Sequence, residues 1–345
     1  MRAVVFHQHG GRDVLRYVED MPQPEPGPEE VLVQVHYCAL NRLDIFVREG
    51  WRGLKLQMPH ILGADVAGQV AAVGEEVSGW QIGDRVVVNP SLYCGHCPSC
   101  LRGEHSMCDQ FGILGETSRG GYAEYVVVPA RNLARVPDKF ELAQAAAVPL
   151  VAITAWRMLI NRAGLRAGET VLVVGAGGGV NSIAIQVAKL AGARVLAVTS
   201  SGEKVDRARA LGADWVVNRH ETDWSRAVWE ATDRRGVDIV VNNVGQDTWF
   251  SSIRALAKGG RLVTVGATSG PKAETDIRYI FSKQISLIGS TMGTQADFDT
   301  VMGLVWAGKL RPVVDRVLLL SQATEAHRIL EQGEQFGKLV LEVKE

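Results

Sequence analysis

The stretch Val171-Leu-Val-Val-Gly-Ala-Gly-Gly-Gly-Val-Asn181 decides the fold of this chain of 345 residues. Apolar residues predict a buried strand, the glycines permit a tight turn, and a helix is predicted over 181–191. A strand, a glycine-rich turn and a helix in this order are typical of dinucleotide binding, because the backbone and the helix N-terminus accept a pyrophosphate. The strict G-x-G-x-x-G spacing is not met, since Val180 or Asn181 stands at the third glycine, and a purely structural turn is the alternative.

On either side of this stretch the pattern differs. Towards the C-terminus, strands alternate with helices, which predicts a parallel sheet with right-handed crossovers. Towards the N-terminus, short strands separated by glycine and proline predict a barrel or sandwich. The predicted strands are 2–6, 31–37, 66–73, 84–88, 123–128, 170–174, 194–198, 237–242, 261–265, 285–289 and 338–343, and the other predicted helices are 203–211 and 248–257.

The composition is that of an ordinary globular protein, with 46% hydrophobic and 22% charged residues. A net charge of −1 provides no basic field for nucleic acid or anionic lipid. No apolar run approaches the roughly 18 residues of a membrane span, and the N-terminal residues lack the pattern of a signal peptide. We therefore expect a cytoplasmic protein of two domains that acts on a small molecule and binds neither nucleic acid nor membrane.

Four cysteines follow one another as C-x2-C-x2-C-x7-C, at Cys94, Cys97, Cys100 and Cys108. Four thiolates suit one tetrahedral Zn²⁺ and leave no position open for water or substrate, so we predict one structural zinc ion per chain. Free thiols without metal are the alternative. His96 and His105, in the same loop, are expected to face solvent. Cys38 is expected to be a buried spectator, with a reactive thiol or a metal ligand as alternatives.

The end of the second predicted strand bears on coenzyme choice. A site that prefers NAD places an acidic residue there for the ribose 2′-hydroxyl. This chain has Thr199 and Ser200 instead, with Lys204 and Arg207 close behind. Hydroxyl groups and a cation suit a 2′-phosphate, so NADP(H) is favoured over NAD(H). The alternative is that these residues only cap the next helix.

Several motifs together resemble the zinc-containing medium-chain dehydrogenase/reductase superfamily along the whole chain. They include Asn41-Arg-Leu-Asp44, Leu62-Gly-Ala-Asp65, Gly120-Gly-Tyr122 and Phe336-Gly-Lys338. The resemblance implies an α/β protein with a GroES-like, β-rich catalytic domain over 1–150 that carries a zinc lobe at 91–110. It further implies a Rossmann domain, a doubly wound parallel sheet, over 151–291, a return to the catalytic domain over 292–345, and a homodimer or homotetramer.

The resemblance also places Asn41, Ala64 and Leu150 where zinc alcohol dehydrogenases hold a catalytic zinc. Alanine and leucine cannot bind zinc and an amide is a poor ligand. Asn41 and Asp44 are instead similar to the quinone oxidoreductase branch. The candidate catalytic residues are therefore Asn41, Asp44 and Asp65. We expect Asn41 to donate a hydrogen bond to the substrate, with a turn or capping residue as the alternative. By resemblance, Asp44 and Asp65 orient the pocket, with a structural role or direct proton transfer as the alternatives.

The expected coenzyme contacts are shared between residues similar to family contacts and the glycine-rich region. By resemblance, Arg42 touches the pyrophosphate and Thr154 the nicotinamide. The remaining predicted contacts are Gly175, Gly177, Gly178, Gly179, Val180, Asn181, Thr199, Ser200, Lys204, Val244, Gly245 and Gly266.

These features predict an NADPH-dependent oxidoreductase that transfers hydride to a quinone or an α,β-unsaturated carbonyl compound without a catalytic zinc. Such acceptors delocalise the negative charge that a zinc ion would otherwise stabilise. One alternative is a zinc alcohol dehydrogenase with atypical ligands drawn from Cys38, His60 and Asp65. A second alternative is an NADPH-binding protein without catalysis.

Overall fold

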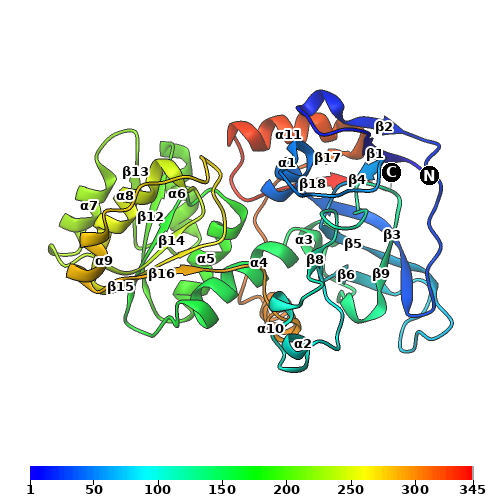
Figure 1. Ribbon diagram of the computed structural model, residues 1–345, viewed down its shortest axis with the longest axis horizontal. Helices are drawn as coiled ribbons and strands as arrows, with labels where there is room; N and C mark the ends of the chain where they lie inside the picture. Colours follow the sequence, from blue (N-terminus) through cyan, green and yellow to red (C-terminus); the bar gives the residue numbers. More distant parts are fainter. Residues whose placement is uncertain (344–345) are drawn as a thin grey trace. The chain divides into compact units, whose positions relative to one another are not determined.

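The computed structural model describes residues 1–343 and divides the chain into two compact units (Figure 1). Unit 1 comprises Met1–Leu150, Gly293–Trp306 and the residues from Pro312 onward, and unit 2 comprises Val151–Met292 and Ala307–Arg311. The sequence had placed all of 292–345 with the first domain. The structure differs at Met292 and at the short segment Ala307–Arg311, because both pack with unit 2.

Unit 2 is built on a six-stranded parallel sheet with strand order β13-β12-β11-β14-β15-β16. Numbered along the sheet's own sequence, this is the order 3-2-1-4-5-6 of a doubly wound nucleotide-binding fold. The strands are β11 (Thr170–Val174), β12 (Arg194–Thr199), β13 (Trp215–Asn218), β14 (Val237–Asn242), β15 (Leu256–Thr264) and β16 (Ser286–Gly289). The central strands are runs of buried Val, Leu and Ile, as expected where helices cover both faces of a sheet.

The helices of unit 2 are α5 (Gly179–Leu190), α6 (Gly202–Ala210), α7 (Trp224–Ala231), α8 (Gln246–Ala255) and α9 (Ile277–Lys283). Among these strands and helices of unit 2, the sequence does not predict β13, α7 and α9. Strand β13 has an apolar run of only three residues, 215–217, with polar residues on both sides, so it carries a weak strand signal. Helix α7 has a recognisable start, because the Asp223 side chain accepts hydrogen bonds from the backbone N–H groups of Ser225 and Arg226.

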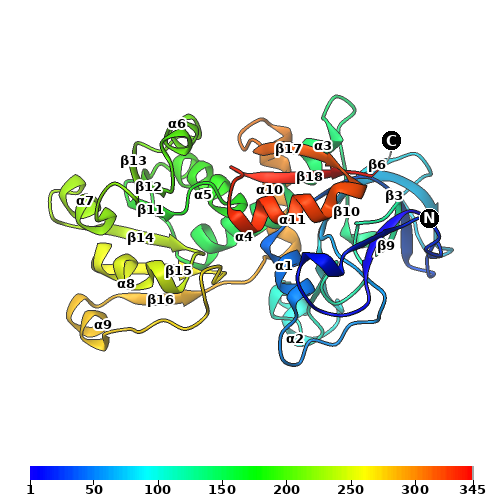
Figure 2. The same ribbon diagram turned by 90° about the horizontal axis from the view of Figure 1, so that it is seen from above.

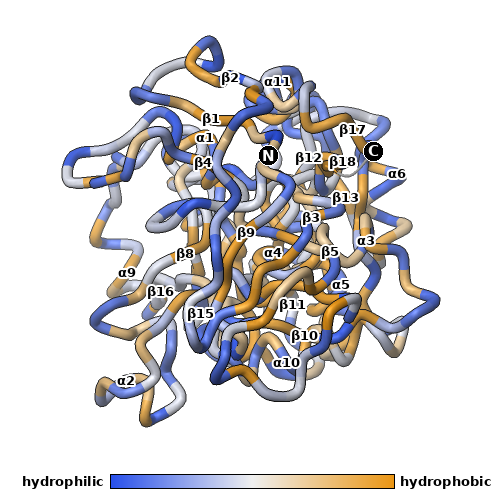
Figure 3. Tube along the Cα trace, turned by 90° about the vertical axis from the view of Figure 1, so that its right-hand side faces the viewer, coloured by the Kyte–Doolittle hydropathy of each residue, from blue (hydrophilic) through white to orange (hydrophobic). Residues whose placement is uncertain are grey.

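Unit 1 is mainly β-structure, as predicted. Its largest sheet runs β10-β6-β5-β3-β18-β17, with β9 also paired to β3, and β1 joins β2 and β4 in a small sheet. The strands are β1 (Ala3–Phe6), β2 (Arg16–Val18), β3 (Glu30–Ala39), β4 (His60–Ile61), β5 (Asp65–Val73), β6 (Arg85–Val88), β7 (Ser91–Leu92), β8 (Gly112–Ile113), β9 (Tyr125–Pro129), β10 (Leu133–Arg135), β17 (Val314–Leu319) and β18 (Lys338–Glu342). Figure 3 shows the apolar character of β5, β9 and β11 along the trace.

Helices of unit 1 are α1 (Arg42–Glu49), α2 (Pro98–Leu101), α3 (Leu142–Ala146), α10 (Gln295–Trp306) and α11 (Ala323–Gln332), while α4 (Pro149–Trp156) begins in unit 1 and ends in unit 2. Helix α11 lies beside β17 and β18 (Figure 2). The final strand β18 pairs antiparallel with β3, so the last segment completes the first sheet. No helix within residues 1–343 has the length and hydropathy needed to cross a membrane.

Candidate functional site

The glycine-rich loop lies between β11 and α5, at the carboxyl edge of the parallel sheet in unit 2. Gly175 has a φ of 84°, in the left-handed region that favours glycine, and Gly178 is the residue before the first turn of α5. The first N–H groups of a helix have no acceptor within that helix, so they are available to an anion. The loop therefore fits the pyrophosphate of a dinucleotide.

Asn181, which stands where a third glycine was expected, ties this loop to its neighbours. Its Nδ2 donates to the carbonyl oxygens of Val174, at 2.8 Å, and Gly175, at 2.9 Å. Its Oδ1 accepts from Asn243 Nδ2 at 2.8 Å, and Asn243 Oδ1 accepts from the Val265 N–H at 3.1 Å. The buried amide of Asn181 and the half-buried amide of Asn243 thus link the ends of β11, β14 and β15, and they stabilise the loop through specific hydrogen bonds.

The other predicted coenzyme contacts of unit 2 lie after neighbouring strands of the same sheet. Val244 and Gly245 follow β14 and donate their N–H groups to Asn242 Oδ1, at 2.9 and 3.0 Å. Gly266 follows β15 and Thr199 ends β12. Parallel strands present their carboxyl ends on one edge, so these positions share an edge with the glycine-rich loop.

Thr199 lies on that edge but its side chain is engaged locally, whereas Thr154 and Arg42 do not follow strands of this sheet. Thr199 Oγ1 donates to the Ser201 carbonyl oxygen at 3.2 Å, which is a local turn contact. Thr154 lies on α4 and is buried against Met292, with its Oγ1 3.8 Å from the sulfur. Arg42 lies in unit 1, at the start of α1, where its Nη2 is 3.5 Å from the Glu331 carbonyl oxygen.

The four cysteines of the predicted zinc lobe converge. Their sulfur atoms all lie within 4.8 Å of one another, with Cys94 Sγ 3.5 Å from Cys108 Sγ and 3.9 Å from Cys100 Sγ. A tetrahedral zinc with bonds of about 2.3 Å requires sulfur separations of about 3.8 Å. The set is the one group of three or more His, Cys, Asp or Glu side chains within residues 1–343 that is arranged to hold a metal ion. It fits a structural zinc.

Local backbone groups support thiolates in this lobe. N–H groups of Cys97 and Gln110 point to the sulfurs of Cys94 and Cys108, both at 3.3 Å. A backbone hydrogen bond from Cys100 is the main cause that lowers the pKa of Cys97 to about 6, whereas burial raises the pKa of Cys100 to about 12. A bound cation favours the thiolate form at every ligand.

His105 is not simply solvent-facing, contrary to the prediction. Its Nδ1 accepts from the backbone N–H of Gln295 at 3.1 Å, and its ring lies 4.2 Å from that of Tyr93. It therefore joins the zinc lobe to the start of α10. His96 is exposed, as expected.

A second polar cluster, buried in unit 1, consists of Asn41, Asp65 and Lys338. Asp65 Oδ2 accepts from Asn41 Nδ2 at 2.9 Å and from Lys338 Nζ at 2.8 Å. Asp65 Oδ1 accepts from the Leu150 N–H at 2.8 Å. Lys338 Nζ also donates to Asn41 Oδ1 at 2.5 Å. Asp65 thus holds together Asn41 and Leu150, two of the three positions that resemblance assigned to zinc ligands.

Lys338 was not assigned a role from the sequence, although it ends the Phe336-Gly-Lys motif. Its side chain reaches the cluster because β18 starts there and pairs with β3, the strand that precedes Asn41. Gly337, with a φ of 94°, permits the approach to β17, since a Cβ there would lie 2.3 Å from the Val313 carbonyl oxygen. The lysine is therefore placed by the return of the chain to the first sheet.

Asp44 organises the backbone around this cluster. Its Oδ2 accepts from the Asn41 N–H at 2.7 Å and its Oδ1 from the Gly63 N–H at 3.1 Å. Its position at the third residue of α1 also caps that helix. Burial raises the pKa of Asp44 to about 6. The carboxylate is satisfied by the protein itself, as a structural role also requires, so its orientation of the pocket stays a prediction.

A chain of buried groups leads from Arg48 to Asp44. Arg48 Nη1 contacts His327 Nδ1 at 3.1 Å, His327 Nε2 lies 3.3 Å from the Tyr122 hydroxyl, and that hydroxyl donates to Asp44 Oδ2 at 3.3 Å. Arginine can only donate, so Nδ1 accepts and the proton resides on Nε2. Burial and Arg48 lower the pKa of His327 to about 3, so the ring is neutral. In each of these three hydrogen bonds, the donor lies on the Arg48 side and the acceptor on the Asp44 side.

The alternative metal ligands named from the sequence do not converge. Cys38 is completely buried, and burial raises the pKa of its thiol, so it is a spectator rather than a reactive group. His60 Nε2 lies 3.1 Å from the Gly115 carbonyl oxygen, which occupies that nitrogen. Asp65 is occupied by the contacts described above.

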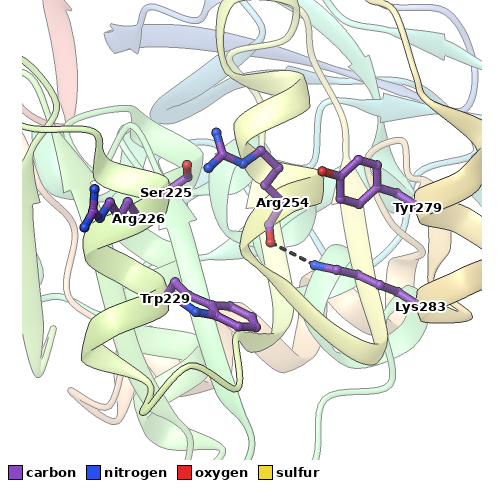
Figure 4. Close-up of a pocket in the computed structure, with 6 residues that line it drawn as sticks. All are labelled: Ser225, Arg226, Trp229, Arg254, Tyr279 and Lys283. Carbon is purple, nitrogen blue, oxygen red and sulfur yellow. Dashed lines mark hydrogen bonds between the residues drawn. The ribbon is translucent and has the colours of Figure 1, made fainter.

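A shallow pocket in unit 2 carries positive charge but has a structural explanation. It is lined by Ser225, Arg226, Trp229, Arg254, Tyr279 and Lys283 (Figure 4). Lys283 Nζ donates to the carbonyl oxygens of Arg254 and Leu256, at 2.9 and 2.7 Å, and so satisfies the C-terminal end of α8. Arg226 pairs with Glu230 at 3.1 Å. The charges of Lys283 and Arg226 therefore stabilise α8 and α7, the helices around the pocket.

Comparison with known proteins agrees with both units. The family described as "Alcohol dehydrogenase GroES-like domain" matches residues 27–138, and the family "Zinc-binding dehydrogenase" matches residues 179–307. An NAD-dependent alcohol dehydrogenase of Saccharolobus solfataricus is 34% identical over 94% of this chain and 95% of its own length. The human quinone oxidoreductase is 31% identical over 99% of this chain and 97% of its own. An acryloyl-coenzyme A reductase of Metallosphaera sedula is 33% identical, covering 99% of each chain.

Solved structures give the same result. The crystal structure of an NAD-dependent alcohol dehydrogenase superposes with a TM-score of 0.96 at 47% identity over 100% of both chains. A 2-octenoyl-CoA carboxylase reductase, solved with NADP and 2-octenoyl-CoA, has a TM-score of 0.89 at 31% identity, covering 99% of this chain and 87% of its own. The chain is an oxidoreductase that belongs to the zinc-containing medium-chain dehydrogenase/reductase superfamily.

Proposed function

We propose that this protein is an NADPH-dependent reductase of quinones or α,β-unsaturated carbonyl compounds, and that it uses no metal in the chemical step. The observation that carries the proposal is the cluster of Asn41, Asp65 and Lys338. It contains an amide, a carboxylate and an ammonium group, and no thiolate or imidazole that zinc would select. Relatives named quinone oxidoreductase and acryloyl-coenzyme A reductase support the same reaction class.

The charge balance of the cluster favours such acceptors. An alkoxide that forms at a simple carbonyl concentrates charge on one oxygen and needs a Lewis acid nearby. A quinone or conjugated carbonyl spreads this charge over its own π-system, so positioning and a few hydrogen bonds suffice. The reduced coenzyme, when bound, supplies the hydride, and the glycine-rich loop and the start of α5 hold its pyrophosphate.

The preference for NADPH is part of the proposal. Strand β12 ends at Thr199, and Ser200 and Ser201 follow before α6, so the first acidic residue after the strand is Glu203. An acidic partner for a ribose 2′-hydroxyl at the strand end is thus replaced by hydroxyl groups. The relative named NAD-dependent argues for NADH, which makes the ratio of kcat/KM for the two coenzymes the direct test.

The experiment measures oxidation of NADPH and NADH with 1,4-quinones, enones and enoyl-CoA esters, alongside simple aldehydes and alcohols. The proposal predicts turnover of conjugated acceptors, with NADPH the better coenzyme. Turnover confined to aldehydes and alcohols, with two zinc ions per chain, would show a zinc alcohol dehydrogenase instead. Tight coenzyme binding with no turnover of any acceptor would show a protein without catalysis.

A further inference from the structure

Lys338 is a buried cation whose role no motif in the sequence assigns. Its side chain is 3% exposed and that of its partner Asp65 is 0% exposed. Lysine is almost never buried to this degree unless it is paired, because an isolated ammonium loses its hydration. The two hydrogen bonds of its Nζ, to Asn41 Oδ1 and Asp65 Oδ2, compensate this loss.

The arrangement fixes the orientation of the Asn41 amide. The ammonium of Lys338 can only donate and an ionised Asp65 carboxylate can only accept. Asn41 lies between them, with its oxygen towards Lys338 and its nitrogen towards Asp65. A flipped amide would place its NH₂ group against the ammonium and its oxygen against the carboxylate. Only one orientation is therefore compatible with both neighbours.

We propose that Lys338 is the positioning residue of the reductase site, an inference that rests on the proposed function. It holds Asn41 and Asp65 in a single arrangement. Its ammonium group contacts Asn41 Oδ1 and Asp65 Oδ2, the two oxygens that a metal ion at this position would have to bind. The charges of Lys338 and Asp65 cancel, so the cluster lends no net positive charge to a substrate oxygen. The site therefore selects acceptors that delocalise their own negative charge.

The test compares Lys338→Met, Asp65→Asn and the double variant Lys338→Met/Asp65→Asn with wild type. Lys139→Met, which removes an exposed lysine of the same unit, is the control. For each protein we measure the melting temperature, the zinc content after equilibration with excess zinc and desalting, and kcat and KM with NADPH and a conjugated acceptor.

Lys338→Met leaves an unpaired buried carboxylate, so its melting temperature should fall by about 10 °C. The double variant removes both charges and should recover most of that loss. Its kcat should nevertheless stay at least about tenfold below wild type, because Asn41 is no longer held, while KM for NADPH changes little. Wild type should retain one zinc ion per chain, and Lys139→Met should match wild type throughout.

Recovery of wild-type kcat together with stability in the double variant would overturn the inference, because Lys338 would then only compensate a buried charge. If wild type reduces no conjugated acceptor, the proposed function fails. The melting temperatures and the zinc content then still show whether Lys338 is the cation of this cluster. An unchanged melting temperature in Lys338→Met, or a second zinc ion in wild type, overturns its assignment as the cation of this cluster. One zinc ion and the expected pattern of melting temperatures support it.

Discussion

Replacing Asn181 with alanine tests how this chain holds a coenzyme without the third glycine of the fingerprint. The side chain is buried and makes three hydrogen bonds, two to the carbonyl oxygens of Val174 and Gly175 and one from Asn243. At about 1 kcal/mol net for each bond, the loss amounts to about 3 kcal/mol. This is the upper limit of the binding free energy that a coenzyme must spend to order the loop again. It corresponds to an increase in the Kd for the coenzyme of roughly 150-fold.

We expect an increase of about tenfold in the Kd for NADPH, because part of the loss appears as lower stability of the free protein. Titration of tryptophan fluorescence or calorimetry measures Kd, and thermal denaturation measures stability. Asn181→Asp should raise the Kd for NADPH more than Asn181→Ala does, because its carboxylate would face the carbonyl oxygens of Val174 and Gly175. Asn218→Ala is the control, because the side-chain hydrogen bond of Asn218 to Glu221 is exposed. A Kd within twofold of wild type for Asn181→Ala, with a lowered melting temperature, would refute the reasoning.

Four further predictions concern stability, metal content and assembly. Burial raises the pKa of Asp44 to about 6, whereas the pKa is about 3.9 in the unfolded chain. The folded state therefore holds the proton more tightly, which increases the free energy of unfolding. This increase is complete below about pH 4 and is lost as the pH rises through 6. Relative to Asp44→Asn, the free energy of unfolding of wild type should therefore fall by up to about 3 kcal/mol between pH 4 and 7.5 in urea denaturation, and a rise would contradict this. Tyr122→Phe leaves the buried His327 N–H without an acceptor and should cost about 1–3 kcal/mol in the same assay, whereas no cost would contradict the hydrogen-bonded chain. Cys97→Ser should reduce zinc to well below one ion per chain by elemental analysis and lower the melting temperature, and full zinc retention would contradict the four-cysteine site. We also propose a homo-oligomer that pairs the edge strand β16, in which Leu287 is exposed; the preceding helix α9 also exposes Ile277 and Phe281. Leu287→Lys should therefore reduce the mass measured by light scattering, and an unchanged mass would contradict the pairing.

The parts of the fold that were predicted carry local signals. The apolar run 170–174 and the glycines after it identify a strand and a turn from neighbouring residues alone, and the four cysteines lie within one loop. Strand β3 was predicted from its alternating pattern but is longer than expected, because its ends also pair with neighbouring strands: Glu30 pairs with Pro129 of β9, and Ala39 pairs with Asp65 of β5. Strand β13 was missed because its apolar run covers only residues 215–217, between Asp214 and Asn218.

The polar interior of unit 1 could not be predicted because it joins distant residues. Lys338 is 297 residues from Asn41, and His327 is 205 from Tyr122, so no spacing rule links them. The Phe336-Gly-Lys motif contains Lys338, which begins an apolar strand. A lysine at such a position indicates burial and therefore a paired carboxylate. His105 was expected to face solvent because its acceptor role depends on Gln295, which only the folded chain brings near.

We propose that the four-cysteine lobe is the one metal site within residues 1–343, and that hydride transfer proceeds without a metal. The most direct measurement is zinc per chain by elemental analysis on the same preparation whose NADPH-dependent reduction of a conjugated acceptor is assayed. The account predicts one zinc ion per chain at full activity. Two zinc ions per chain, with activity lost in proportion as the second is removed by a chelator, would contradict it.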